Sequence, residues 1–255
     1  MRKIVLPVFL ACAFAMPAGL SAQTAKADSI LKPVMVLVEG GTFTMGALVD
    51  SAEQGQVTFN TARQVTLSGF QIGKYEITQA EWKAVMGSNL SFHQDCPTCP
   101  VEEVSWNDVQ LFIRTLNEKT GKHYQLPTAA QWEFAARGGN KSKRYKYAGS
   151  NDIDAVAWYG GEYIDRTHPV GRKQSNELGI YDMSGNVEEW CSDWFDPYPD
   201  RSAVTNPTGP ESSAGHVIRG GSWGYNPTGC GVLGGHIGYP DDRSAHVGFR
   251  LVLAP

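Results

Sequence analysis

The spacing of apolar and polar residues in the first half of the chain predicts short strands and three helices. Short β-branched or alternating apolar runs, which are typical of strands, lie at 34–38, 40–46, 64–67 and 70–77, and a closing run lies at 249–253. Helices are expected where a capping residue precedes apolar positions three and four apart. Such starts occur at Thr78, Ser105 and Thr128, and glycines at 121 and 138–139 mark two helix ends.

The pattern changes after Asn140. Glycine, proline, asparagine and aspartate are scattered among isolated aromatic residues, and no helical or strand period is sustained. This half is expected to be rich in loops held by buried aromatic side chains. No internal repeat or second domain boundary is evident, so we predict one α+β domain over 34–255, after a flexible lead-in at 23–33.

Composition narrows the possible partners. The chain has 255 residues, a net charge of −4 and 19% charged residues. This balance does not favour nucleic acid as a partner. After the first 22 residues, no stretch reaches the roughly 20 apolar residues that a transmembrane helix needs, so we expect no transmembrane span.

The N-terminus has the pattern of a signal peptide over 1–22. Arg2 and Lys3 precede an apolar run that reaches Leu20, and a small residue, Ala22, suits cleavage. We therefore predict an exported protein, periplasmic or extracellular. An alternative is a lipoprotein anchored through Cys12, although the apolar run continues well beyond that residue.

An exported chain would keep four cysteines, and an even number in an oxidising compartment suggests disulfides. Cys96 and Cys99 would close a local loop. Pairing Cys191 with Cys230 would close a loop of about 40 residues and stabilise the fold by roughly 4 kcal/mol, and we favour this pairing. A redox role for the C-x-x-C pair is an alternative, but an extended stretch rather than a helix follows it.

Many segments, in order along the chain, resemble the sulfatase-modifying factor family, which includes the formylglycine-generating enzyme. The resemblance implies a mixed fold related to C-type lectin domains, with little regular structure. The matching segments are 40–46, 74–82, 100–108, 126–128, 132–133, 135–139, 168–171, 176–187, 189–190, 219–223 and 248–250.

The resemblance predicts the family's fold more strongly than it predicts the family's catalytic activity. The enzymes oxidise a substrate cysteine to an aldehyde, using copper held by two cysteines five positions apart. Cys230 matches the second cysteine, but Tyr225 stands at the first. Copper(I) prefers two thiolates, so we do not expect copper here. If the protein were an enzyme, Cys230 would be its thiolate and Ser222 would help to bind oxygen or substrate.

The resemblance also implies a calcium site. Asp182 and Glu189 would supply carboxylate oxygens, and Gly185 and Val187 would supply backbone carbonyls, which are the hard ligands that calcium takes. The alternative is a purely structural turn, in which Asp182 accepts from backbone amides and Glu189 forms a salt bridge.

Other catalytic patterns are missing from the sequence. It has neither H-E-x-x-H nor G-x-S-x-G, and its six histidines lack the spacing of a helical metal site. His236 and His246 flank the family's site in sequence. If the protein is a binder, Trp223, Tyr225 and His236 are expected to line its groove.

Three functions remain open from the sequence. The favoured one is a non-catalytic, exported member that binds a peptide, a glycan or a partner protein in the family's substrate groove. The second is a divergent oxygen-dependent oxidase acting on cysteine or another side chain. The third is a structural component of a periplasmic or surface assembly.

Overall fold

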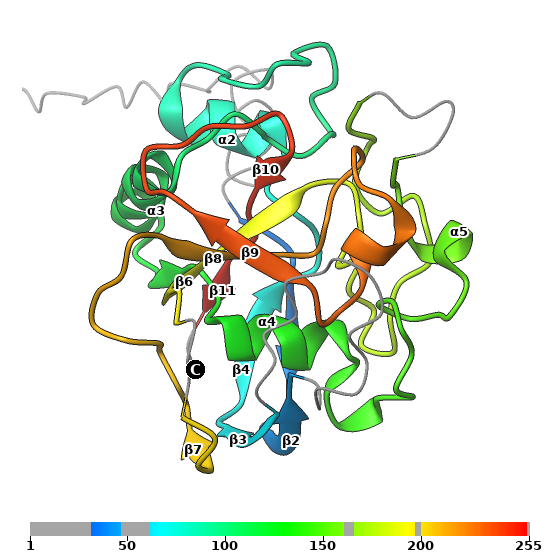
Figure 1. The fold of residues 1–255 in the computed structure, drawn as a ribbon. Coiled ribbons are helices and arrows are strands. Elements are labelled where there is room, and N and C mark those ends of the chain that lie inside the picture. Colours follow the sequence, from blue (N-terminus) through cyan, green and yellow to red (C-terminus); the bar gives the residue numbers. More distant parts are fainter. Residues whose placement is uncertain (1–31, 47–61, 161–165, 197–199, 254–255) are drawn as a thin grey trace, which may run out of the picture.

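The computed structural model describes residues 32–46, 62–160, 166–196 and 200–253 (Figure 1). The predicted signal peptide, Cys12 and nearly all of the predicted lead-in lie outside these residues. The helices are α2 (Gln79–Met86), α3 (Trp106–Thr120), α4 (Ala129–Ala136) and α5 (Ile153–Val156), with 3-10 turns η2 (Gly139–Lys141) and η3 (Pro227–Cys230). The strands are β1 (Met35–Val38), β2 (Gly41–Met45), β3 (Arg63–Leu67), β4 (Phe70–Gly73), β5 (Tyr124–Gln125), β6 (Glu188–Trp194), β7 (Val204–Thr205), β8 (His216–Arg219), β9 (Gly235–Gly238), β10 (Val247–Gly248) and β11 (Val252–Leu253).

One sheet joins the two ends of the described chain. Its strand order is β1-β4-β11-β5, and all of its pairs are antiparallel. Ile72 on β4 is fully buried, with Val36 opposite it on one side and Val252 on the other. The first and last described strands therefore flank the same central strand.

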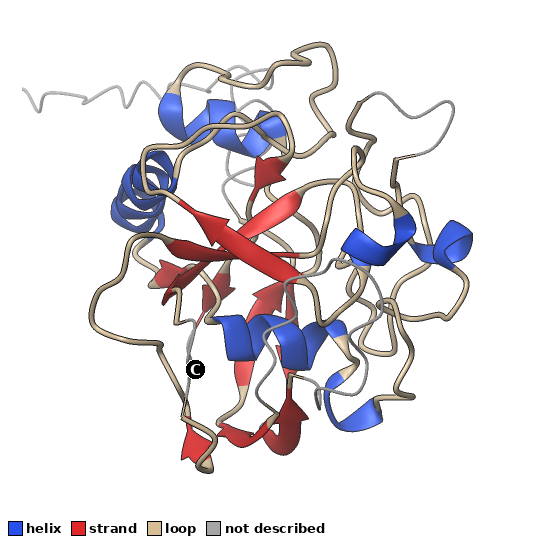
Figure 2. Cartoon of the chain, viewed as in Figure 1, coloured by secondary structure: helices blue, strands red, loops and turns tan. Residues whose placement is uncertain are grey.

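A second sheet, with the order β10-β6-β8-β9, carries the residues singled out at the C-terminal end of the sequence. β6 pairs parallel with β10 and antiparallel with β8, and β9 pairs antiparallel with β8. A third sheet has the order β2-β3-β7. Figure 2 shows long loops between these short elements.

The three helices predicted from their capping residues are confirmed. Thr78, Ser105 and Thr128 each accept a hydrogen bond from the backbone amide three residues on, and the side chain at that third position accepts from the cap's own amide. These reciprocal bonds satisfy two amides that a helix start would otherwise leave unpaired. Gly121 ends α3 in the left-handed conformation that glycine favours.

The core forms two main apolar clusters. One gathers around α4 and the faces of β3 and β4. The other packs α2 and α3 against the C-terminal strands, where Trp82 stacks on Phe112 at 5.2 Å and both meet Phe249 edge-on. These aromatic contacts fix the two helices at the upper left of the view in Figure 1.

Three expectations from the sequence need correction. The strand expected over 70–77 ends at Gly73, and the closing strand expected over 249–253 is confined to Val252–Leu253. The second half also holds more regular structure than its pattern suggested, because β6, β8 and β9 form the centre of a sheet there. Polar side chains of these strands are buried against partners that are distant in sequence. The strands therefore lack the alternation of apolar and polar residues by which a half-buried strand is recognised.

Candidate functional site

The residues that the family frame singles out meet beside the second sheet. Ser222, Trp223 and Tyr225 follow β8, Cys230 ends η3, and His236 lies in β9. Glu188, at the start of β6, and His246, just before β10, complete the group through the contacts described below. We call these seven residues the Tyr225 site.

Two glycines allow the chain to pass from β8 into this site. Gly220 and Gly221 have φ values of 101° and 69°, which side chains rarely adopt. A Cβ atom at Gly221 would lie 2.5 Å from the Gly229 carbonyl oxygen and 2.8 Å from the Cys230 sulfur. Only a glycine at position 221 leaves enough space for the backbone to pass this close to Cys230.

Glu188 is the centre of a buried polar network. Its side chain is 3% exposed, and its Oε1 lies 3.0 Å from His236 Nδ1. The Tyr225 side chain lies next to the same carboxylate, and burial, followed by the Glu188 charge, raises the pKa of its phenol. Burial disfavours the charged form of His236, but the hydrogen bond and charge of Glu188 outweigh it and raise the pKa of the imidazole.

Cys230 lies beneath this network as a protonated thiol. It is fully buried, and its Sγ is 3.8 Å from the Ser222 carbonyl oxygen. Burial, and then the charge of Glu188, raise its pKa to about 12. Because a soft copper(I) ion binds thiolates, a single thiol held in its neutral form beside a phenol does not fit the copper centre that the family's enzymes use.

A row of aromatic rings runs from the site toward the surface. The His246 ring lies 4.3 Å from Trp223 and 6.3 Å from Tyr225, between ring centres. His93 lies 6.4 Å beyond Trp223, and Phe92 lies 4.9 Å beyond His93 with 72% of its surface exposed. Sequence reasoning gave no part to Phe92 or His93, because they come from a loop about 130 residues away in the chain.

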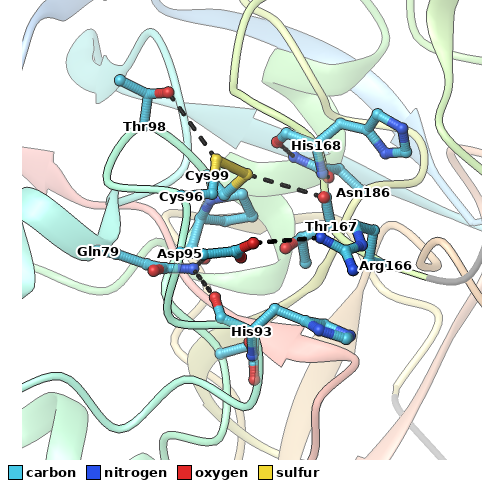
Figure 3. The surroundings of a disulfide bond; sticks show 12 residues. Gln79, His93, Asp95, Cys96, Thr98, Cys99, Arg166, Thr167, His168 and Asn186 are labelled. Carbon is cyan, nitrogen blue, oxygen red and sulfur yellow. Dashed lines mark hydrogen bonds and ion pairs between the residues drawn. A yellow bond between two sulfur atoms is a disulfide. The ribbon is translucent and has the colours of Figure 1, made fainter.

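That loop is fastened by a disulfide and by two buried side chains. Cys96 and Cys99 are bonded, which confirms the predicted local clip (Figure 3). Gln79 donates to the His93 carbonyl oxygen at 2.8 Å. The Glu102 carboxylate accepts from the Phe92 and His93 amides at 2.9 and 3.1 Å.

The favoured pairing of Cys191 with Cys230 is wrong: both residues carry free, buried thiols. Cys191 lies within β6, in the apolar cluster around α4. Its sulfur is 4.0 Å from the Glu189 carbonyl oxygen, whereas that of Cys230 faces Ser222. Both thiols are therefore buried in separate packing environments, which loop length alone does not reveal.

The loop predicted to bind calcium has one unpaired carboxylate oxygen. Asp182 Oδ2 accepts from the Gly171 amide at 2.7 Å, whereas its Oδ1 is buried without a hydrogen-bond partner. An orphaned buried carboxylate oxygen fits a cation. Asp182 adopts φ 56° and Gly185 φ 76°, so the loop is sharply bent, as a cluster of oxygen ligands requires.

Glu189 is already engaged by protein groups. Its two oxygens each lie 2.6 Å from Arg250, and Oε2 also accepts from the Trp132 indole at 2.7 Å. This is the salt bridge of the structural alternative. In the described parts of the chain, no three His, Cys, Asp or Glu side chains are grouped so that they could hold a metal ion. Of the two predicted carboxylate ligands, Asp182 therefore has an oxygen left for a cation, whereas Glu189 is held by Arg250.

The strand order and the C-terminal frame place the chain among proteins with the formylglycine-generating enzyme-like fold. The structure is similar to Treponema denticola variable protein 1, with a TM-score of 0.79 and 30% identity, covering 87% of this chain and 95% of that one. It is also similar to PvdO from Pseudomonas aeruginosa, with a TM-score of 0.73 and 28% identity, covering 88% and 95% of the two chains.

The chain belongs to the sulfatase-modifying factor enzyme 1-like domain family, whose profile matches residues 21–255. It is 34% identical to the chaperone protein LppX of Paenibacillus barcinonensis over 274 aligned positions, covering 88% of this chain and 89% of that protein. It is 35% identical to the formylglycine-generating enzyme of Streptomyces coelicolor over 188 positions, covering 67% of this chain and 57% of the enzyme. The predicted family and fold class are confirmed.

No helix within the described ranges is long and apolar enough to cross a membrane.

Proposed function

We propose that this protein is a non-catalytic member of the family that binds a peptide, a glycan or a partner protein at the Tyr225 site. The observation that carries the proposal is the position of Tyr225 beside the buried Glu188 carboxylate, which also holds His236 at 3.0 Å. The family resemblance implies a cysteine at position 225 and, in many relatives, a tryptophan at position 188, so Tyr225 and Glu188 both depart from the family and lie in one site. By that resemblance, a phenol stands where the enzymes carry one of the two thiols that hold their metal.

The aromatic row supports a binding role. Aromatic rings provide large contact areas with little conformational entropy to lose, and they are enriched where proteins bind partners. The row begins at exposed Phe92 and ends at the Tyr225 site, so a partner would meet a continuous series of rings. The relative named a chaperone favours a polypeptide among the three ligand classes.

The second candidate is a divergent oxidase, and the observation that favours it is the thiol of Cys230 beside Ser222. Ser222 Oγ lies 3.3 Å from His246 Nδ1. A thiol raised to a pKa of about 12 is a poor ligand and nucleophile near neutral pH, which places this candidate behind the first. A structural role in a surface assembly is the third, and a stable oligomer at low concentration would support it.

Export is part of the same proposal. It rests on the signal-peptide pattern at 1–22, and the Cys96–Cys99 disulfide is compatible with an oxidising compartment. Calcium is a further part. Asp182 Oδ1 and the carbonyls of Gly185 and Val187 would hold the ion and tie the loop before β6, with Glu189 remaining paired to Arg250.

The direct test incubates the protein with a Cys-x-Pro-x-Arg peptide, copper(I) and oxygen, and measures the peptide by mass spectrometry. We expect no aldehyde from the wild type. Tyr225→Cys combined with Glu188→Trp reverses both departures, and aldehyde from that variant would show a scaffold that lost its metal ligands. Aldehyde from the wild type, lost in Cys230→Ser, would overturn the proposal and favour the oxidase.

A further inference from the structure

A cavity of about 490 Å³ opens between the third sheet, β6 and the start of α4, and it shares no lining residue with the Tyr225 site. A cavity of this size is within the range of small-molecule sites. β3 and β7 lie at the lower edge of the view in Figure 1, with α4 above them. The cavity is therefore a candidate site separate from the one already described.

The loop after β7 forms one wall of the cavity and is anchored. The Asn206 amide donates to the Thr66 carbonyl oxygen at 2.8 Å, and its side chain bonds both the amide and the hydroxyl of Ser68. Gly209 then passes so close to Asp193 that a Cβ atom there would lie 2.9 Å from the aspartate Cβ. The wall is thus held in place by side-chain bonds and a close backbone approach.

The apolar part of the lining includes a fixed aromatic ring. Trp194 stacks on His216 at 3.8 Å, and His216 in turn stacks on Trp106 at 3.9 Å. Met45, Val217 and Pro210 also line the cavity. A ligand with an apolar or aromatic body would meet a rigid ring rather than a mobile side chain.

The charged part of the lining is acidic. Asp193, Asp196 and Asp200 line the cavity together with Arg63 and Arg219. The Arg219 guanidinium is fully buried and lies 2.6 Å from Glu133, a carboxylate that also pairs with Arg137 at 2.8 Å. The lining therefore holds three carboxylates and two arginines, an excess of one negative charge. Asp193 is 6% exposed, and its Oδ2 is fixed by bonds from the Ala129 amide and the Ser192 hydroxyl at 3.0 and 3.1 Å.

We propose that this cavity binds a small organic cation, a primary amine on an apolar or aromatic body. The amine would face Asp193, where a carboxylate held at low exposure interacts strongly with a cation. The body would lie against Trp194 and the apolar residues beside it. This site is independent of binding at the Tyr225 site.

The test compares phenethylamine with 2-phenylethanol, which has a similar shape but no charge, by isothermal titration calorimetry on the full chain. We expect the amine to bind at least about tenfold more tightly, which corresponds to about 1.4 kcal/mol. Asp193→Asn should remove most of that preference. Asp241→Asn, the same charge change in a loop outside the cavity lining, should leave it intact.

Asp193 also caps α4, so its variant must first be shown to be folded by circular dichroism. Asp200→Asn, at an exposed position, provides a second variant and should weaken amine binding by a smaller factor without affecting the helix. Equal affinities for the amine and the alcohol would overturn the proposal. So would the absence of binding by either probe, or binding of a neutral sugar such as glucose in their place.

Discussion

The buried guanidinium of Arg250 ties together four segments of the chain. It donates to both oxygens of Glu189 at 2.6 Å, and to the carbonyl oxygens of Gly73 and Tyr181 at 3.0 Å each. A weaker bond reaches the Asp182 carbonyl oxygen at 3.4 Å. Both side chains of the ion pair are 0% exposed.

Arg250→Met would leave the Glu189 charge buried with the Trp132 indole as its side-chain donor. Removing one partner of a buried pair costs about 3–5 kcal/mol, and the carbonyls that lose their donor add to this. We therefore expect the free energy of unfolding to fall by at least about 4 kcal/mol, a large part of the 5–15 kcal/mol typical of a whole domain. Urea unfolding followed by circular dichroism measures the change.

Two comparisons make this test specific. Arg243→Met removes an arginine that is 47% exposed and pairs with Asp108 at 2.8 Å, and the loss should be below about 1 kcal/mol. Adding Glu189→Gln to Arg250→Met should cost less than the sum of the two single changes, because the charge is removed together with its partner. A loss below about 1 kcal/mol for Arg250→Met would refute the reasoning.

Three further predictions concern thiols, pH and calcium. The chain without residues 1–22 should react as two free thiols under denaturing, non-reducing conditions, because Cys191 and Cys230 are unpaired; a count of zero would contradict the structure. Burial lowers the pKa of His216 below its ordinary 6.5, so as the pH falls the unfolded chain binds a proton at this residue before the folded chain does. The free energy of unfolding should therefore fall as the pH drops below about 6.5, by at most about 1.4 kcal/mol per pH unit for one proton. His216→Phe keeps a ring between the two indoles and should show a shallower fall in urea titrations at several pH values; equal slopes would count against this role. Calcium at 100 times its dissociation constant should stabilise the fold by about 2.7 kcal/mol, measured as a rise in melting temperature. Asp182→Asn should abolish this rise, and an undiminished rise in the variant would exclude Asp182 as a ligand.

The helix starts could be predicted from the sequence because their determinants are local. Each capping box spans four residues, so Ser105 and Asp108 carry the whole signal between them. The Cys96–Cys99 bond is local for the same reason. The family resemblance supplied the rest of the fold, as the similar solved structures confirm.

β6 could not be predicted, because its buried side chains include Glu188, Glu189 and Asp193. A strand with three buried carboxylates has no apolar alternation to detect. The groups that make burial possible lie far away in sequence: His236 for Glu188 and Arg250 for Glu189. The Tyr225 site was missed in part for the same reason, since no local pattern connects Tyr225 with Glu188.

We propose that Tyr225 and Glu188 have replaced the metal-binding chemistry of the family's enzymes. A competition titration, in which the protein and a chromophoric copper(I) chelator compete for the metal, decides this. We expect wild type and Cys230→Ser to take up copper(I) equally poorly. Tyr225→Cys combined with Glu188→Trp should compete well, because two thiolates then face the ion. Tight binding by the wild type that Cys230→Ser abolishes would show that the metal-binding chemistry is retained.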